Sequence, residues 1–335
     1  MNDKTPATLP FADRLRYSAE AAVFFAGIGF FRLIGLSAAS AVGGFVGRNI
    51  FYRISGIMNR ARENLRAALP EKTQAEREAI ILEMCDNLGR TVAEYAHLDK
   101  FSMHGDNPRL EIVNRDTGEA AIARGKGVMF FSGHFANWEM MPFIAQQLGF
   151  EGGEVYRPPN NPYIDRWLVQ QRMKNGPAEQ ISKGPQGTRK IFTLLRRGKC
   201  IFLLTDQKTN EGIAAPFFGR EAMTTPAPAM FALKLGSILL PAVNERIDGG
   251  RRFRMTIYPP LQYTPTGDQD HDVHALTCLI NDAVERMVRP RPSQWLWIHR
   301  RWPTSREQDQ VRGKRAVQAL GGTGVRVESE GSSFT

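Results

Sequence analysis

A short apolar run that stops at a histidine constrains the fold of this chain more than any other stretch. Val128 to Phe131 has the length and composition of a buried β-strand. Ser132-Gly133 ends the run, His134 follows at once, and Asn137 is placed to cap a helix that begins after it. The pattern predicts a histidine in the turn between a buried strand and a helix.

A carboxylate, Glu139, follows His134 by five residues. Five helical residues turn through roughly 500°, so this pair shares no helix face and meets only if the histidine lies in the turn. A histidine held by a carboxylate and open to a substrate is the arrangement that a general base needs. Because 34 of the 335 residues are acidic, a histidine finds an acid at a fixed offset roughly one time in ten. The strand-and-turn context therefore supports the hypothesis more than the spacing does.

Two further strand-like segments end at polar residues. Gly153 to Arg157 predicts a strand that ends at Arg157, and Lys199 to Thr205 predicts one that leads directly into Asp206-Gln207. Strands alternate with helices along this part of the chain, which indicates an α/β fold with a mixed, largely parallel sheet flanked by helices. Ligands of such sheets bind beyond the carboxyl ends of the strands. We therefore expect His134, Arg157 and Asp206 to share one site.

The remaining elements follow from periodicity and from capping signals. Thr73-Gln-Ala-Glu76 predicts a capping box at the start of a helix. We expect helices near 54–69, 73–95, 163–174, 187–197, 229–235 and 271–288, further strands at 110–113, 237–243 and 252–258, and a long loop over 215–228.

Residues 21–47 form a long apolar segment in which Arg32 is the single charge. A bilayer is crossed by about 20 apolar residues, but an arginine near the middle is costly there. Six glycines could instead divide the segment into two helices that lie in the membrane interface, and a buried helix pair is a third possibility. We favour membrane contact because helices of a soluble core usually have only 10–14 apolar residues. The sequence leaves open whether the segment spans the bilayer.

The chain carries an excess of positive charge, with 44 Lys and Arg against 34 Asp and Glu, which gives a net charge of +10. Such a balance favours polyanionic partners, namely nucleic acid, anionic lipid headgroups or an acidic carrier protein. Five arginines between 48 and 66 follow the apolar segment, and by the positive-inside rule they place the rest of the chain in the cytoplasm. Three scattered cysteines predict neither a disulfide framework nor a metal site. No cleavable signal peptide is expected.

These features predict four regions. They are a flexible N-terminus (1–18), a membrane-associating helical segment (19–66), an α/β domain (67–303) and a disordered tail (304–335).

Other interpretations of the motifs are weaker or stay open. A metal site would need further His or Cys ligands near His134 and Glu139. A nucleophilic Ser132 lacks the G-x-S-x-G pattern, and neither common glycine-rich nucleotide motif follows a strand. The aromatic and basic segment Trp295–Trp302 suits base stacking, a lipid headgroup interface, or packing on the core.

A set of motifs in a fixed order resembles a known family. The set comprises Asn59-Arg-x-Arg-x-Asn-Leu65, Gly133-His-x4-Glu139, Tyr156-Arg-x3-Asn-Pro162, Asp206-Gln207, Pro216-Phe-Phe-Gly219 with Thr224, and Trp297-x-His-Arg-Arg-Trp302. Over about residues 20–303 the chain is similar to the late (lauroyl/myristoyl) acyltransferases of lipid A biosynthesis in Gram-negative bacteria. The Glu-Gly-Thr-Arg block of the glycerol-phosphate acyltransferases is absent, which argues against a glycerol-phosphate acceptor.

The resemblance implies a fold like that of the glycerolipid acyltransferases and a location at the cell inner membrane, with the catalytic domain on the cytoplasmic side. It implies transfer of a fatty acyl chain from acyl-acyl carrier protein to a hydroxyl of a lipid A precursor, with no cofactor, metal or nucleic acid. An anionic membrane surface would be the third partner. His134 would be the base and Glu139 its partner. The substrate-binding residues would be Arg157, Asn161, Arg172, Asp206 and Gln207.

Two other functions are compatible with the same sequence. One is an acyltransferase that acts on another glycolipid or lipid-linked acceptor, such as an ornithine lipid or a phosphoglycolipid. The other is a non-catalytic peripheral protein that binds lipid through residues 21–66 and the tryptophan-rich segment.

Overall fold

The computed structural model describes residues 9–106, 108–177 and 179–302. The described residues up to Arg301 form one compact unit, so the helical segment expected at 19–66 belongs to the same unit as the α/β domain. A helix begins at Phe11, so residues 11–18 of the region expected to be flexible are helical. Residues 1–8 and the tail expected at 304–335 lie outside the described residues.

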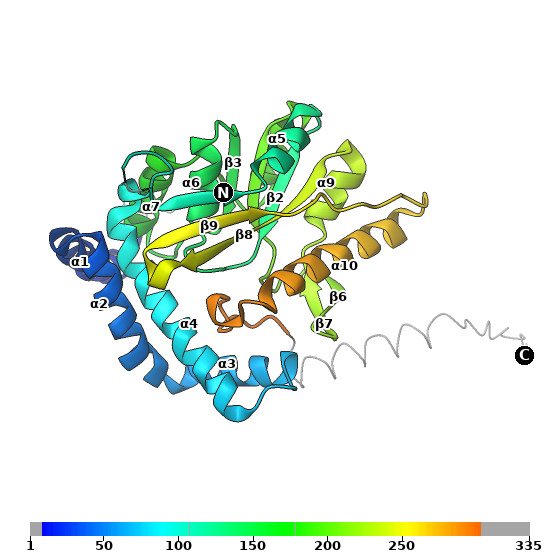
Figure 1. The fold of residues 1–335 in the computed structure, drawn as a ribbon. Coiled ribbons are helices and arrows are strands. Elements are labelled where there is room, and N and C mark those ends of the chain that lie inside the picture. Colours follow the sequence, from blue (N-terminus) through cyan, green and yellow to red (C-terminus); the bar gives the residue numbers. More distant parts are fainter. Residues whose placement is uncertain (1–8, 107, 178, 303–335) are drawn as a thin grey trace, which may run out of the picture. The chain divides into compact units, whose positions relative to one another are not determined.

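A seven-stranded sheet forms the centre of this unit, in the order β1-β9-β8-β2-β5-β3-β4 (Figure 1). Neighbouring strands are parallel except for the β8–β9 pair, which is antiparallel. The structure confirms the predicted α/β class with a mixed, largely parallel sheet. The strands are β1 (Leu110–Val113), β2 (Val128–Ser132), β3 (Gly152–Tyr156), β4 (Glu179–Ser182), β5 (Cys200–Leu204), β8 (Ile238–Ile247) and β9 (Arg252–Ile257).

Helices cover the sheet and extend beyond it. They are α3 (Ser55–Ala68), α4 (Gln74–Glu94), α5 (Arg115–Ala123), α6 (Met140–Gln147), α7 (Pro162–Asn175), α8 (Pro185–Arg196), α9 (Ala227–Leu235) and α10 (Gln269–Val288). The predicted capping box opens α4, because the side chains and backbone amides of Thr73 and Glu76 bond reciprocally. The strands differ from the prediction in two places. The expected loop over 215–228 contains a hairpin of β6 (Ile213–Phe217) and β7 (Arg220–Thr224), and β4 was not expected.

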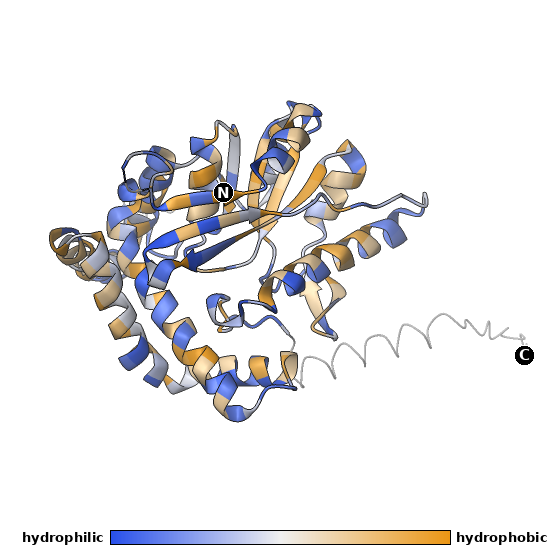
Figure 2. Ribbon diagram, in the orientation of Figure 1, coloured by the Kyte–Doolittle hydropathy of each residue, from blue (hydrophilic) through white to orange (hydrophobic). Residues whose placement is uncertain are grey.

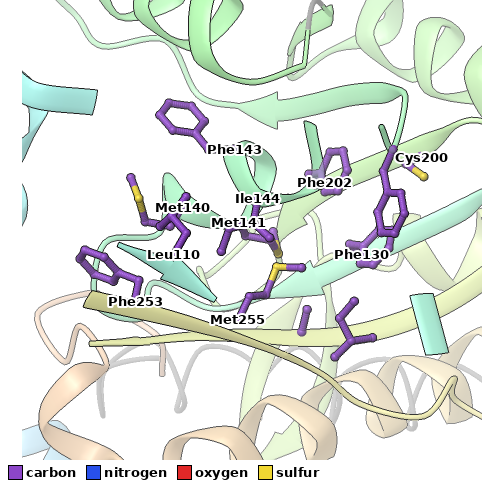
Figure 3. Close-up of a cluster of buried hydrophobic side chains, with 14 of the residues drawn as sticks. Leu110, Phe130, Met140, Met141, Phe143, Ile144, Cys200, Phe202, Phe253 and Met255 are labelled. Carbon is purple, nitrogen blue, oxygen red and sulfur yellow. The ribbon is translucent and has the colours of Figure 1, made fainter. Parts of the chain in front are cut away.

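Strand β2 is the most deeply buried strand, since all five of its residues are buried. It lies between β8 and β5 in the middle of the sheet, which explains why its sequence is a continuous apolar run rather than an alternating one. Figure 3 shows Phe130 of β2 and Phe202 of β5 packed with Met140, Met141 and other buried side chains. This core fixes the position at which β2 ends.

Two helices, α1 (Phe11–Ile34) and α2 (Leu36–Asn49), precede this domain and are separated by Gly35, whose φ of 78° interrupts the helical path. One face of α2 packs closely on α4. A Cβ on Gly47 would lie 1.9 Å from the carbonyl oxygen of Cys85, so only glycine permits this approach. The glycines of the apolar segment thus serve helix packing in α2, whereas α1 remains largely exposed.

Candidate active site

His134 lies in the turn after β2, as the sequence predicts. Its backbone carbonyl accepts a hydrogen bond from the amide of Leu296 at 3.1 Å, and its neighbour Phe135 forms a β-bridge with Trp295. The C-terminal segment therefore holds this turn in place. The imidazole is largely buried, with 13% of its side chain exposed at the wall of a cavity.

Asp206 is the carboxylate that holds this imidazole. Its Oδ1 lies 2.7 Å from Nδ1 of His134, and its Oδ2 accepts the backbone N–H of His134 at 2.7 Å and the indole N–H of Trp295 at 2.8 Å. Burial would raise the pKa of this carboxyl group, but the nearby histidine and these hydrogen bonds outweigh burial and hold the pKa well below its usual range. Asp206 is therefore ionised at neutral pH and fixes the orientation and tautomer of His134.

Gly133 makes this contact possible. A Cβ at this position would lie 2.9 Å from Oδ2 of Asp206 and 2.9 Å from Nε1 of Trp295. Any larger residue would therefore push apart the two groups that meet beside the histidine.

Glu139 does not hold His134, so the predicted pairing is wrong. Its Oε1 accepts bonds from Nη2 of Arg172 and from the hydroxyl of Tyr95, each at 2.6 Å, and its Oε2 accepts from Nε of Arg172 at 2.8 Å. Burial opposes ionisation of this carboxyl group, but Arg172 outweighs burial and lowers its pKa. The structure thus joins Glu139 and Arg172 as a buried, bidentate ion pair that ties α6 to α7.

A second carboxyl group, Glu154 on β3, faces the same arginine. Its Oε1 lies 3.7 Å from Nε of Arg172. Burial, together with the negative charge of Glu139, raises the pKa of Glu154 to about 7. One guanidinium thus faces two carboxyl groups, of which Glu139 holds the closer position.

His299 is a second histidine beside the first, and sequence reasoning did not assign it a role. Its ring centroid lies 4.8 Å from that of His134. The side-chain amide nitrogen of Gln207 lies 3.3 Å from Nε2 of His134 and 3.5 Å from Nε2 of His299. Burial above all lowers the pKa of His299 to about 4, so this ring is neutral at physiological pH. The signal that could have found it is its place in the motif Trp297-x-His299.

A cavity of about 680 Å³ opens beside His134 and Gln207. Residues from β2, β3 and β5 and from α8 and α9 form its walls. Apolar and polar side chains line the cavity in similar proportion, and the apolar ones include Met129, Met141, Val155, Ile191, Ile201, Leu203 and Phe231. The exposed Arg157 and Lys183, which follow β3 and β4, also line the cavity. The space combines an apolar interior with cationic groups, which suits an amphiphilic anion.

Most of the predicted site residues lie at or beside the cavity, and Asn161 lies away from it. His134, Asp206 and Gln207 meet at the ends of β2 and β5, and Arg157 and Arg172 line the same cavity. Asn161 has a different place. It is buried at the start of α7, where its side chain accepts the backbone N–H of Tyr163 and donates to the carbonyl of Tyr17 in α1.

The first turn of α8 also contributes to the cavity. Its sequence, Gln186-Gly187-Thr188-Arg189, differs only at the first residue from the Glu-Gly-Thr-Arg block, and Gly187 and Thr188 line the cavity. The argument against a glycerol-phosphate acceptor therefore depends on a single residue. Within the described ranges, no group of three or more His, Cys, Asp or Glu side chains is arranged to hold a metal ion.

The fold and these groups define an α/β protein with a carboxylate-held histidine at the edge of a cavity that has both apolar and cationic side chains in its walls. The bacterial lipid A biosynthesis acyltransferase family matches residues 9–304, and the chain belongs to this family. It is 25% identical over 249 residues to the lipid A biosynthesis lauroyltransferase of Escherichia coli. The aligned region covers 73% of this chain and 78% of the lauroyltransferase. The chain is 26% identical over 255 residues to the palmitoleoyltransferase of the same organism, with the same coverage. The phosphatidylinositol mannoside acyltransferase of Mycobacterium tuberculosis is 23% identical over 279 residues, with 80% and 86% covered. The protein is an acyltransferase enzyme of this family, and its apolar N-terminal helix is consistent with membrane anchoring.

Proposed function

We propose that this enzyme transfers a fatty acyl chain from acyl-acyl carrier protein to a hydroxyl of a lipid A precursor, at the cytoplasmic face of the inner membrane. The observation that carries the proposal is the His134–Asp206 pair at the wall of the cavity. A hydroxyl is a weak nucleophile at neutral pH, and attack on a thioester requires a base within hydrogen-bond reach. The family match supports the acyl donor and the lipid A acceptor.

The geometry gives His134 and Asp206 separate tasks. With Nδ1–H donated to Asp206, Nε2 carries the lone pair that accepts the proton of the attacking hydroxyl. The acceptor oxygen forms a bond to the thioester carbon, the C–S bond then breaks, and the proton passes from His134 to the departing thiolate. Asp206 stabilises the imidazolium between these two steps without accepting its proton.

Gln207 is the candidate donor to the oxyanion that forms on the carbonyl oxygen. Its amide nitrogen lies next to Nε2 of His134, where the reacting carbonyl must also lie. The neutral His299 sets the other side of this space and adds no positive charge that would oppose protonation of His134. Glu139 and Arg172, in contrast, act as the positioning pair that fixes α6 and α7 around the cavity.

The cavity supports a long acyl chain and an anionic substrate. A volume of about 680 Å³ with both apolar and polar groups in its lining has the size and character of a pocket for an amphiphile. Arg157 and Lys183 suit phosphate groups, which both a lipid A precursor and the prosthetic group of a carrier protein contain.

The direct test uses the full-length enzyme in mixed micelles, with radiolabelled acyl-acyl carrier protein and a lipid A precursor. We expect labelled lipid with the native enzyme and a loss of about 10²- to 10⁴-fold in His134→Ala. Lys126→Ala, at an exposed position before β2, is the matched control and should retain full activity. Full activity in His134→Ala would contradict the mechanism. Mass spectrometry of lipid A from a strain that lacks the gene should show the loss of one acyl chain, whose mass identifies the donor.

A second acceptor class follows from one comparison. The mannoside acyltransferase match spans more of this chain than the two lipid A relatives do. The same assay with another phosphoglycolipid as acceptor separates the two functions. Transfer to that lipid, with none to the lipid A precursor, would support the second function.

A further inference from the structure

Helix α1 carries a large exposed apolar face. Its exposed fractions reach 73% at Phe11, 75% at Val23 and 87% at Leu33, values that are unusual for large apolar side chains in contact with water. Figure 2 shows the apolar colouring that runs through α1 and continues into α2. By length and composition alone this helix is able to cross a membrane.

The opposite face of α1 is attached to the α/β domain near both ends of the helix. At the first end, the side chain of Asn161 donates to the carbonyl of Tyr17 at 2.8 Å. At the second end, the guanidinium of Arg32 donates to the carbonyl of Ala96 at 2.6 Å and pairs with Asp99.

Further contacts lie between and beside these two attachments. Phe24 packs edge-to-face on Trp167 of α7, with ring centroids 5.4 Å apart. The carbonyl of Phe31 lies 2.9 Å from Nε2 of His97, in the 3-10 helix η3 (Tyr95–Lys100). The helix is therefore attached to the domain along its length and not only through its loop.

This attachment is incompatible with a helix that crosses the bilayer. Tyr17 and Arg32 are 15 residues apart, which corresponds to about 22 Å of helix, against a hydrocarbon thickness of about 30 Å. If α1 stood upright in the membrane, the domain residues that hold its two ends would be separated by most of that thickness. Charged groups such as Asp99 would then have to lie in hydrocarbon or on the far side.

We propose that α1 lies flat in the membrane interface, with its exposed apolar face in an anionic bilayer and both of its ends on the side of the active site. Apolar residues that follow α1 extend the same kind of surface, namely Phe45, Ile50, Ile54 and Ile57, each at least 37% exposed. Arg14 and Arg53 are exposed in these segments and supply the positive charge that anionic headgroups attract, whereas Arg16 pairs with Asp13 and Glu20.

The placement has a consequence for the cavity. Pro158, Pro159 and Asn160 line the cavity, and the next residue, Asn161, holds α1. The cavity wall and the membrane helix are thus joined by the same few residues. On the basis of the proposed function, a lipid acceptor would reach the site from the bilayer surface without leaving it.

A sidedness measurement tests the orientation of α1. In a Cys278→Ser background, in which Cys85 and Cys200 are buried, one cysteine is introduced at Arg14 and, in a second variant, at Lys126. Sealed membrane vesicles of known orientation are treated with a membrane-impermeant maleimide. We expect both cysteines to react from the same side, since α1 does not cross. Reaction from opposite sides would overturn the proposal.

A binding measurement tests the lipid partner. Flotation of the purified full chain with vesicles of phosphatidylglycerol and phosphatidylethanolamine should show binding that falls at least about tenfold in the double variant Val23→Glu/Leu33→Glu. The double variant Val92→Glu/Val113→Glu adds the same two charges at exposed apolar positions outside α1 and should bind as the native chain does. Equal binding of the double variant would overturn the proposal. Neither measurement depends on acyl transfer, so each can fail while the proposed reaction stands.

Discussion

Nδ1 of His134 lies 2.7 Å from Oδ1 of Asp206, a residue 72 positions further along the chain. The two meet because β2 and β5 are parallel neighbours in which Ser132 is paired with Leu204. His134 and Asp206 each follow the paired residue by two positions. The register of the sheet therefore sets the contact that orients the imidazole.

Replacement of Asp206 by Asn tests this contact. The amide keeps the shape of the carboxylate but loses the charge that stabilises an imidazolium, so we expect kcat to fall by about 10²- to 10⁴-fold. If the amide oxygen takes the place of Oδ2 and keeps its two donors, the amide nitrogen faces Nδ1 of His134. Two N–H groups then meet unless His134 changes tautomer, and an unsatisfied buried donor costs about 1–3 kcal/mol of stability. Steady-state kinetics and thermal unfolding of the same preparation separate the two effects. A kcat within a factor of two of the native value would contradict the role of Asp206.

Replacement of Glu139 by Gln should act on stability first. Arg172 would lose its bidentate partner in a buried site, and removal of one partner from a buried pair costs about 3–5 kcal/mol. The expected result is a large drop in the unfolding free energy. Since Glu139 bonds to Arg172 and Tyr95, the histidine should keep its orientation in the molecules that remain folded.

The control for this variant is the comparison with Asp206→Asn at equal folded fraction. A folded Glu139→Gln enzyme that loses as much kcat as Asp206→Asn would show that the glutamate serves the reaction directly.

The sequence predicted the strand ends correctly because the signals for them are local. The apolar run of β2 and the segment that leads into Asp206 are both short and clearly bounded, so the polar groups beyond them could be placed at one edge of the sheet. The choice of partner for His134 could not be predicted in this way. It depends on which strands are neighbours, and that order results from packing between residues far apart in the sequence.

The same limit explains why the partner of Glu139 and the packing role of the glycines in α2 were not predicted. Glu139 is close to His134 in sequence, but it lies at the start of α6, where its carboxylate reaches Arg172 on α7. One of the six glycines, Gly35, does divide the apolar segment into two helices, whereas Gly43 and Gly47 permit close contact between α2 and α4. Local sequence patterns do not show that Glu139 contacts α7 or that Gly43 and Gly47 contact α4.

The pH dependence of stability should change when Glu154 is replaced by Gln. The pKa of Glu154 is raised from 4.5 to about 7, so the folded state binds this proton more tightly than the unfolded state does. The protonated Glu154 carboxyl group therefore contributes to the unfolding free energy in full below about pH 4.5, and this contribution is lost as the pH rises to about 7. Glu154→Gln should remove that loss and raise the unfolding free energy at pH 8, relative to pH 5, by about 1–3 kcal/mol compared with the native chain.

Urea unfolding in one detergent at the two pH values measures this difference. Glu211→Gln, at an exposed carboxylate that lines the same cavity, is the matched control and should keep the native pH dependence. An unchanged pH dependence in Glu154→Gln would show that the group titrates normally.

Asn64 should contribute to catalysis through His299, although it lies on α3. Its side-chain amide donates to the carbonyls of Trp297 at 2.7 Å and of His299 at 2.9 Å, and thereby fixes the segment that carries the second histidine. Loss of these bonds in Asn64→Ala allows the imidazole of His299 to shift beside His134. We expect kcat to fall by about 10- to 100-fold, since small displacements of site groups have effects of this size.

A double-mutant cycle provides the control. If Asn64 acts by positioning His299, then Asn64→Ala should change kcat by less than about twofold in a His299→Ala background. Effects that multiply in the double variant would mean that Asn64 acts on the reaction by another route, such as the placement of Trp297.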